Sequence, residues 1–400
     1  MVPNGWRLIA LENIADPSAA IRYGVVQIGE HTENGIPIVP IKFIKSIDTA
    51  KLHRVSASIE AKYKNSRIHA GDVLISVKGT IGAVGIVPEG FSGNIAREIA
   101  RIRPSVKYDS NYIAFQLQAD HTQREIENLT VGTTRKEFSI HTLKKFEILV
   151  PPLNEQQKIV KILSTWDQAI SATEKLLENS QQQKKALMQQ LLTGKKRLLD
   201  ENGVRFSGVW KHIKLRSLIK EIKRDKEENP NNIELLTVKL HNKGAVASGK
   251  FPNSTEGGRP YYKRFAGELI IGRQNLHNGG VAIVPSECNG LIASNAISSF
   301  EALNDCDINF ILSIMSTSHF RYLIDNLTGG TGQKEVSVRE LLNVFVFIPC
   351  VEEQQKIAKV LTIADQEIET LQKKLDCLKQ EKKALMQQLL TGKKRVKVAA

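Results

Sequence analysis

The sequence is poor in cysteine, and the four it has, Cys288, Cys306, Cys350 and Cys377, form no CxxC pair. Scattered cysteines predict neither a disulfide framework nor a metal site. They indicate a reducing compartment, for which we expect the cytoplasm. No run approaches eighteen consecutive apolar residues, so no membrane-spanning helix is expected. The first residues lack a basic leader followed by an apolar run, so we expect no signal peptide.

Motifs of catalysis are missing as well. The sequence contains no (D/N)PP(Y/F) motif of amino methylation, no glycine motif for S-adenosylmethionine, no Walker loop and no HExxH, and its nine histidines show no triad spacing. The glycines of GDVLISVKGTIGAVGIV, residues 71–87, have the spacing GxxGxxG. This spacing matches no nucleotide-binding loop, and the run predicts two strands around a turn-rich tip. We therefore expect a chain that is not an enzyme and that holds no cofactor or metal.

Basic side chains are what the chain has in excess. Its 56 Lys and Arg outnumber 42 Asp and Glu, for a net charge of +14. Such a balance favours a polyanionic partner, usually nucleic acid, although it also suits a merely soluble basic protein. No polybasic tail is present, so a binding surface would have to be assembled by folding. Arg97, Arg101 and Arg103 alternate along an expected strand, where they either meet phosphates or form a solvated face.

The chain contains a long internal repeat. KKALMQQLLTGKKR occupies residues 184–197 and recurs without change at 382–395. A shift of 198 aligns residues 155–197 with 353–395 without a gap, and 27 of these 43 positions are identical. Upstream the likeness falls to 10 of 25 positions between 128 and 152. The pattern indicates two divergent globular regions, each followed by a nearly identical rod.

Each rod is predicted to be a helix of about 39 residues, roughly 58 Å long. Apolar residues recur at steps of three and four, which predicts a coiled-coil seam that Lys184 and Lys382 interrupt. We expect Asn154 to cap the first helix, with Glu352 a poorer cap for the second, and glycine to end both in the left-handed conformation. The expected helix-pair core is Ile159, Leu163, Ile170, Leu177, Leu187, Leu191, Ile357, Leu361, Ile368, Leu375, Leu385 and Leu389.

Chain connectivity favours an antiparallel pair. Residues 205–350 must start near the end of the first helix and finish at the start of the second. A domain of that size has a diameter of about 40 Å, too short to bridge a rod of roughly 58 Å. We therefore expect counter-running helices with a mixed α/β domain at each end, residue 1 beside the end of the second helix, and an approximate internal two-fold axis. The expected boundaries are 1–153, 154–197, 198–351 and 352–400.

The run GTTRKEFSIHTLKKFEILVPPLNEQQKI, residues 132–159, resembles the signature of specificity subunits of Type I restriction–modification systems. In that family a Gly/Thr/Arg-Lys loop leads into a strand, a double proline and an "EQ-K-I" that opens the helix. GDVLISVKGTIGAVGIV and LLTGKKR are similar to the family's other recurrent stretches. The resemblance covers essentially the whole chain. The second copy departs from it at GGTGQKEVSV, with Gly332-Gln333 where the first has Thr134-Arg135.

The resemblance implies a non-catalytic targeting subunit that binds double-stranded DNA. Each globular region would be a target recognition domain that reads one half of a bipartite, asymmetric site. The helix pair would set the gap and dock two adenine-N6 methyltransferase subunits, through which a translocating nuclease subunit joins. S-adenosylmethionine, ATP and Mg²⁺ would belong to those partner chains.

The expected DNA-binding residues lie in four loops. Arg and Lys can pair guanine, Asn and Gln can pair adenine, and Thr or a backbone N–H can hold phosphate. Alternatively the glycines only shape turns and the cations are solvated. The residues are Lys78, Gly79, Thr80, Gly132, Thr133, Thr134, Arg135 and Lys136 in the first domain, and Arg273, Gln274, Asn275, Thr331, Gly332, Gln333 and Lys334 in the second.

Two other functions remain open at this point. The chain could be the recognition part of a self-contained restriction–methylation enzyme, which would require catalytic motifs that this sequence lacks. It could also be a coiled-coil scaffold with protein-binding domains, which explains the heptads but not the loops or the charge. Salt separates the scaffold from a DNA-binding protein, because DNA affinity falls steeply as salt rises.

Overall fold

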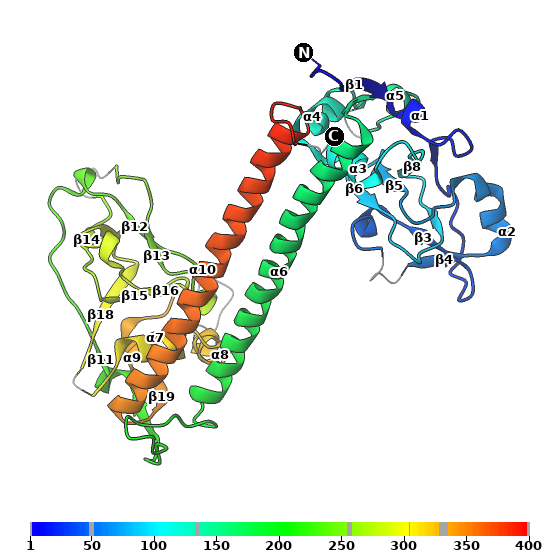
Figure 1. Ribbon diagram of the computed structural model, residues 1–400. Helices are drawn as coiled ribbons and strands as arrows, with labels where there is room; N and C mark the ends of the chain where they lie inside the picture. The colour runs from blue at the N-terminus through cyan, green and yellow to red at the C-terminus, as the bar shows by residue number, and fades with distance from the viewer. Residues whose placement is uncertain are drawn as a thin grey trace. The chain divides into compact units, whose positions relative to one another are not determined.

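The computed structural model describes residues 2–47, 52–132, 136–253, 258–303, 305–327 and 335–397. The chain divides into two compact units. Unit 1 comprises Met1–Glu174 and Lys373–Ala400, and unit 2 comprises Lys175–Gln372. Each unit therefore combines one globular α/β region with part of each of two long helices, α6 and α10 (Figure 1).

Helix α6 spans Leu153–Leu191 and α10 spans Val351–Leu389, so both have the predicted 39 residues. Both end just before a glycine in the left-handed conformation, as predicted: Gly194 has φ 69° and Gly392 has φ 68°. Among the described residues no helix is long and apolar enough to cross a membrane.

The predicted N-caps are wrong by a few residues. The Pro152 carbonyl already accepts hydrogen bonds from the backbone N–H of Glu155 (2.9 Å) and Gln156 (3.1 Å), so Asn154 lies inside the helix. In α10 the Cys350 carbonyl accepts from Gln354 N–H at 3.1 Å, and Glu352 is likewise internal. The residue whose carbonyl accepts the first helical bond is the N-cap, so that position is Pro152 in α6 and Cys350 in α10.

A glutamine locks the start of each long helix. The Gln156 Nε2 donates to the Pro151 carbonyl (2.9 Å) while its Oε1 accepts from Asp109 N–H (2.9 Å). The Gln354 Nε2 donates to the Pro349 carbonyl (3.0 Å), and its Oε1 accepts from Asp307 N–H (3.1 Å). Both aspartates cap a shorter helix, α3 in unit 1 and α7 in unit 2. The repeat of 198 positions therefore reaches into the globular regions.

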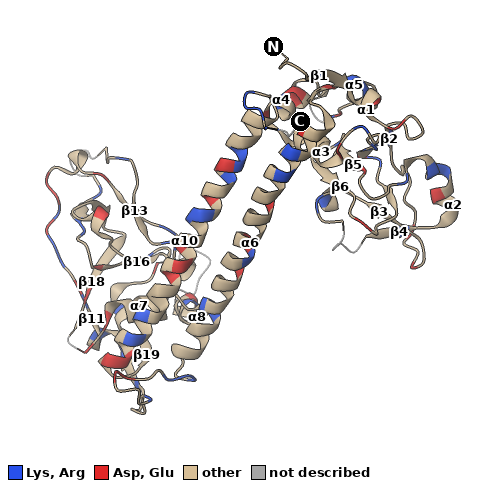
Figure 2. Cartoon of the chain, viewed as in Figure 1, with Lys and Arg blue, Asp and Glu red and all other residues tan. Residues whose placement is uncertain are grey.

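The two long helices run antiparallel in the contacts within each unit. In unit 1, Lys382 Nζ pairs with Asp167 Oδ1 at 2.6 Å and Lys379 Nζ with Glu174 Oε1 at 2.8 Å. In unit 2, Lys184 pairs with Asp365, and Ser180 Oγ donates to Glu367 Oε1 at 3.2 Å. Residue numbers rise along one helix as they fall along the other. Figure 2 shows basic and acidic positions interspersed along both helices.

The seam lysines are half-buried and paired, which explains why the heptad pattern breaks at the same place in both copies. Lys184 and Lys382 differ by 198, as do their partners Asp365 and Asp167, so one interaction is made twice. A lysine at a seam position costs stability but specifies register and orientation. All twelve expected core residues are buried or half-buried.

An arginine–glutamate clasp closes each unit. Arg395 Nε and Nη2 donate to the two carboxylate oxygens of Glu155, at 2.7 and 2.8 Å. Arg197 makes the same bidentate pair with Glu353, at 2.7 Å for both bonds. The glutamate side chains are only 4% and 0% exposed. The clasp joins the start of one long helix to the segment that follows the other.

A tryptophan covers each clasp. The Arg395 guanidinium lies 5.7 Å from the Trp6 ring, and the Arg197 guanidinium lies 5.9 Å from the Trp210 ring. Trp6 Nε1 also donates to Glu155 Oε2 at 3.2 Å. Arg395 Nη1 donates to the Asn4 carbonyl at 2.7 Å. The N-terminal segment therefore lies beside the end of α10, as the chain path predicts.

Within the described residues, the globular part of unit 1 contains three sheets. One pairs β1 with β9 antiparallel, a second has the order β2-β8-β5-β6, and a third has the order β4-β3-β7. The strands are β1 Arg7–Ala10, β2 Arg22–Tyr23, β3 Ile36–Val39, β4 His53–Val55, β5 Val73–Ser76, β6 Val84–Ile86, β7 Asn94–Ile95, β8 Ile99–Ile102 and β9 Glu147–Val150. The helices are α1 Leu11–Ile14, α2 Ala57–Glu60, α3 Ser110–Gln118, α4 Asp120–Asn128 and α5 Ile140–Lys145, with 3-10 turns η1 Ile41–Phe43 and η2 Ala61–Ser66.

Unit 2 repeats this plan with different hairpins. Its central sheet has the order β11-β18-β15-β16, and β10 pairs with β19 as β1 pairs with β9. The strands are β10 Lys211–Lys214, β11 Ile219–Glu221, β12 Leu236–Val238, β13 Ala245–Ala247, β14 Tyr261–Lys263, β15 Leu269–Gly272, β16 Val281–Ile283, β17 Ile292–Ser294, β18 Ile297–Ala302 and β19 Phe345–Ile348. The helices are α7 Ile308–Met315, α8 Ser318–Leu327 and α9 Val338–Leu342, with 3-10 turns η3 Leu215–Ser217, η4 Pro230–Asn232, η5 Leu276–Asn278 and η6 Ser286–Cys288.

The ends of the long helices belong to the hydrophobic cores. In unit 1, Ile159 and Leu163 of α6 and Leu389 of α10 pack in one cluster with residues of the central sheet. In unit 2, Leu191 of α6 and Ile357 of α10 do the same. The fold is therefore mixed α/β, as predicted, with each domain built onto the helix ends.

Arg197→Met tests the clasp. It leaves the Glu353 carboxylate buried without its partner, which typically costs about 3–5 kcal/mol and corresponds to a fall of roughly 6–20 °C in the unfolding temperature of a unit this size. Calorimetry of the full chain measures it. Lys220→Met is the matched control, because the Lys220–Glu301 pair is 3.9 Å apart with side chains 68% and 55% exposed. It should shift unfolding by about 2 °C or less. Equal shifts in both variants would contradict a structural role for the clasp.

Candidate nucleic-acid interface

In unit 1 the structure brings together the two loops that the sequence singles out. Phe138 N–H donates to the Val77 carbonyl at 2.9 Å, and Lys78 forms a backbone bridge with Glu137. Lys78 Nζ also pairs with Glu137 Oε1 at 3.1 Å and lies 4.7 Å from the Tyr23 ring. The loop after β5 therefore sits beside the segment that contains Gly132 and Lys136. The remaining predicted residues of that segment, Thr133, Thr134 and Arg135, lie outside the described residues.

Unit 2 repeats this arrangement with another cation. Arg273 directly follows β15, in the place of Val77 in unit 1, and its carbonyl accepts a hydrogen bond from Val336 N–H at 3.2 Å as the Val77 carbonyl accepts from Phe138 N–H. Arg273 Nη2 pairs with Glu335 Oε1 at 2.9 Å, and Glu335 is Glu137 shifted by 198. Four predicted residues of this loop, Thr331, Gly332, Gln333 and Lys334, lie outside the described residues.

The predicted loop residues differ in exposure. Gly79, Thr80, Gly132 and Lys136 are exposed, as is Asn275 in the second domain. The half-buried residues among them are Lys78, Arg273 and Gln274. In each domain, exposed residues lie beside a cation that a glutamate fixes in place, Lys78 by Glu137 and Arg273 by Glu335. A large, polar ligand could reach such a surface from solvent.

Glycine shapes the first loop, as the alternative interpretation held. Gly79 has φ 75° and Gly82 has φ 83°, a conformation that glycine adopts without strain. Ser76 Oγ donates to the Thr80 carbonyl at 2.6 Å and accepts from Ala83 N–H at 2.8 Å. Gln123 Nε2 of α4 donates to the Gly82 carbonyl at 3.0 Å. Hydrogen bonds of Ser76 and Gln123 therefore hold the loop from both sides, and its tip, Gly79 and Thr80, is exposed to solvent.

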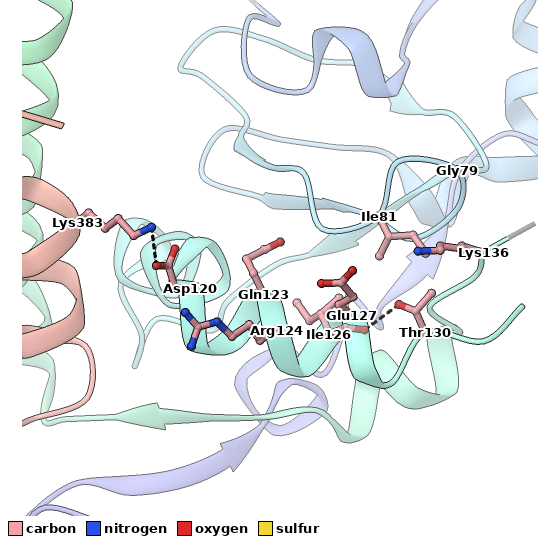
Figure 3. Close-up of a pocket in the computed structure, with 10 residues that line it drawn as sticks. All are labelled: Gly79, Ile81, Asp120, Gln123, Arg124, Ile126, Glu127, Thr130, Lys136 and Lys383. Atoms are coloured by element: carbon pink, nitrogen blue, oxygen red, sulfur yellow. Dashed lines mark hydrogen bonds and ion pairs between the residues drawn. The ribbon is translucent and has the colours of Figure 1, made fainter. Parts of the chain in front are cut away.

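A pocket of about 550 Å³ adjoins this loop (Figure 3). Lys383 Nζ of α10 pairs with Asp120 Oδ2 at 2.9 Å on one wall, and the Lys383 hydrogen bond lowers the pKa of Asp120. The lining residues are Gly79, Ile81, Asp120, Gln123, Arg124, Ile126, Glu127, Thr130, Lys136 and Lys383. The mixed charges and the amide offer both donors and acceptors. Only Gly79 and Lys136 of this set were predicted.

Sequence reasoning missed α4 and Lys383. Lys383 belongs to the exactly repeated segment, which indicated a helix end and not a pocket wall. Residues 120–128 carry a strong amphipathic pattern but no motif. Only the fold places Arg124 and Gln123 beside the loop that follows β5.

The alternating arginines Arg97, Arg101 and Arg103, which lie before, within and after β8, do not share one solvated face. Arg101 is 3% exposed, and its terminal nitrogens donate to the carbonyls of Arg67 (3.0 Å) and Ala20 (2.8 Å). Arg103 pairs with the buried Asp72 at 2.7 Å. Arg97 pairs with its neighbour Glu98 at 2.9 Å. Arg101 and Arg103 therefore hold parts of the domain together, whereas Arg97 is exposed to solvent.

Metal-ligating side chains do not cluster in the described part of the chain. No group of three or more His, Cys, Asp or Glu side chains there could hold a metal ion. The buried Cys306 has its pKa raised to about 12 by desolvation, so its thiol stays protonated.

Comparison with known proteins identifies the family. The sequence profile of the Type I restriction modification DNA specificity domain matches residues 23–180 and 209–380. Those two segments cover most of the chain and fall one in each half of the repeat. The chain therefore belongs to the Type I restriction modification DNA specificity domain family. Its role is DNA target recognition in a Type I restriction–modification system.

Individual relatives agree with this assignment. The chain is 29% identical over 195 residues to the specificity subunit of the Type I restriction enzyme EcoBI from Escherichia coli, a match that covers 48% of this chain and 41% of that protein. It is 23% identical over 425 residues to the specificity subunit of the Type I restriction enzyme MjaVIII from Methanocaldococcus jannaschii, covering 99% of this chain and 94% of that one.

Solved structures share the fold. The crystal structure of a Type I restriction–modification S subunit from M. genitalium has a TM-score of 0.62 at 15% identity, with 98% of both chains covered. A structure from work on complex assembly of the type I R-M system has a TM-score of 0.54 at 16% identity, again with 98% coverage of both chains. The two-domain architecture with two long helices is common to them.

Gly82→Ala tests how the first loop is held. Gly82 and Gly90 share the left-handed conformation, so alanine strains either by about 1 kcal/mol. At Gly82 the new Cβ would also lie 2.4 Å from Gln123 Oε1 and displace that amide, whereas at Gly90 it meets nothing within 4 Å. Thermal unfolding should therefore show Gly82→Ala roughly 2–4 °C less stable than Gly90→Ala, the matched control. Equal losses would show that Gln123 does not hold the loop.

Proposed function

We propose that each domain reads one half of a bipartite DNA target and that the two half-sites differ. The observation that carries the proposal is the repeated loop arrangement: Lys78 beside Glu137 in unit 1, and Arg273 beside Glu335 in unit 2. A basic residue pairs with an equivalent glutamate in both units, but the side chains that the loops offer to a ligand differ, for example Lys78 in unit 1 and Arg273 in unit 2. Readers with different donors and acceptors select different bases, so the target is not a palindrome.

The helix pair, in this proposal, sets the gap between the half-sites. Paired contacts hold the register of α6 against α10, and ion pairs between Lys184 and Asp365 and between Lys382 and Asp167 make a slip of one turn costly. A stiff element of fixed length between two readers tolerates only one spacing of their sites.

The helix ends also supply the docking surface that we propose for two methyltransferase subunits. Identity between the copies is concentrated at the helix ends, and several identical positions there are exposed, such as Lys161 with Lys359 and Gln189 with Gln387. Because the helices run antiparallel, the start of one lies beside the end of the other, so each unit carries the same patch. In unit 2 the patch borders an apolar groove of about 610 Å³ that includes Met188.

Specificity subunits are non-catalytic targeting components, and the chemistry in this proposal lies on the partners. The methyltransferase subunits would carry S-adenosylmethionine and modify adenine at N6. A nuclease subunit that joins through them would use ATP and Mg²⁺. Because the proposed ligand is DNA, we also propose that the protein acts in the cytoplasm.

Exchange of residues 1–150 for the first domain of another family member tests the assignment. The full chain and the exchanged chain would each select duplexes from a random pool, and sequencing would report the half-sites and the gap. We expect one half-site to change while the other half-site and the gap stay. Two changed half-sites would contradict independent readers, and selection of no duplex would contradict DNA binding. The unmodified chain, selected in parallel, is the control.

A further inference from the structure

We propose that the second domain contains a phosphate-binding cavity centred on Arg264, which takes a backbone phosphate of the second half-site. This inference rests on the proposed function and names a contact within it. The geometry that points to it is one cavity of unit 2, about 320 Å³ in volume, which three arginines line.

The cavity is basic and adjoins the predicted reading loop. Arg224, Arg264 and Arg273 contribute guanidinium groups, and Lys223 adds a fourth cation. Arg273 is the residue predicted to contact DNA. The remaining lining residues are Glu221, Ile222, Tyr262, Asn295, Ile297, Ser298 and Ser299.

Carboxylates already neutralise two of the arginines. Arg224 Nη1 donates to Glu268 Oε2 at 3.0 Å, and its Nη2 donates to the other carboxylate oxygen. Arg273 pairs with Glu335 at 2.9 Å. Glu221 is the carboxylate on the cavity lining, and the charges of Glu268 and Glu221 both raise the pKa of Arg264 without contacting it directly.

Arg264 has no carboxylate at ion-pair distance among the described residues, yet it is 4% exposed. Its terminal nitrogens donate to neutral acceptors, Nη1 to Ser299 Oγ at 3.2 Å and Nη2 to the Ile297 carbonyl. Within the described part of the chain its buried Nε has no hydrogen-bond partner. Burial lowers the pKa of Arg264 to about 10, so the group is still charged at neutral pH.

A buried cation with no carboxylate in direct contact is costly, and an anion in the cavity would lower that cost. The planar guanidinium fork matches the oxygens of a phosphate. The volume admits a phosphate group, and the neighbouring Ser298 and Asn295 offer further donors. A DNA backbone that meets the Arg273 loop would carry a phosphate to this cavity, so the contact would position the second domain on its half-site without reading bases.

Arg264→Met in the full chain tests the site. We expect roughly tenfold weaker binding to a duplex selected by the unmodified chain, and a log–log salt dependence reduced by about one unit, because one phosphate contact is lost. A scan with single neutral methylphosphonates across the second half-site should show one position that weakens the unmodified chain and not the variant. An unchanged salt slope together with an unchanged scan would overturn the proposal.

Arg101→Met is the control for burial. Arg101 is as buried as Arg264, and within the described part of the chain its Nε likewise has no hydrogen-bond partner, but it does not line this cavity. Arg101→Met should therefore lower thermal stability while it leaves the salt slope and the second half-site scan unchanged. A loss of slope in this variant as well would mean that destabilisation alone weakens binding, which would overturn the assignment of Arg264.

Asn295→Asp keeps the test valid if Arg264→Met does not fold. This isosteric change adds a negative charge on the cavity lining, so it should weaken binding roughly tenfold by repelling the phosphate. Asn309→Asp makes the same change at an exposed position of α7 outside the lining and should leave affinity unchanged. Equal affinities in the two variants would overturn the proposal.

The source of the phosphate is tested separately. If the cavity held free phosphate, inorganic phosphate at constant ionic strength would raise the unfolding temperature of the unmodified chain but not of Arg264→Met, and the DNA salt slope would not change between them. That result would overturn the assignment to the DNA backbone. Absence of any DNA binding by the unmodified chain would instead remove the proposed function itself.

Discussion

The antiparallel contact between α6 and α10 is the interaction on which the rest of the structure depends. Its polar elements are made twice, as Lys184–Asp365 and Lys382–Asp167 along the seam and as two arginine–glutamate clasps at the helix ends. Each clasp is nearly closed to solvent on its glutamate side, so it is favourable only while both partners are in place. The hydrophobic cores of both units include the helix ends, so both helices contribute to the core of each domain.

This dependence explains the distribution of identity along the sequence. The exactly repeated stretch ends in Arg197 or Arg395, whose clasp partners, Glu353 and Glu155, lie at the start of the other copy. A substitution in one stretch would have to be matched in a distant one. Among the described residues, the loops after β5 and β15 form no such pair with the other copy, so this constraint does not act on them. These contacts account for long helices that are nearly identical in the two copies and for loops that differ between them.

The sequence predicted the frame well and the reading surfaces only in outline. Heptad spacing, helix length and the left-handed glycines follow from local rules that depend on few residues, and all three agree with the structure. The Asn154 cap did not, because the Pro152 carbonyl takes the first helical bonds, which no composition rule shows. Arg101 looked like a surface residue because a period of two cannot tell which face of a strand is covered.

The cavities depend on contacts that local patterns do not record. Lys383 meets Asp120 across 263 positions of sequence, and α4 backs a loop that precedes it by some 40 residues. Arg264 gave no signal in the sequence at all, since a lone arginine in a divergent segment is commonplace. The proposal for it rests on burial, on the lack of a carboxylate at ion-pair distance among the described residues, and on the two other arginines of the same cavity.

Lengthening the rod tests the central claim most directly. The antiparallel pairs are centred near Leu176 of α6 and Lys374 of α10, so a seven-residue insertion after each keeps the heptad seam and both clasps. The insertion adds about 10 Å, or about three base pairs of DNA. Duplex selection with the lengthened full chain should return the same two half-sites with a gap about three base pairs wider. The same half-sites with an unchanged gap would contradict the claim that the helix pair sets their spacing.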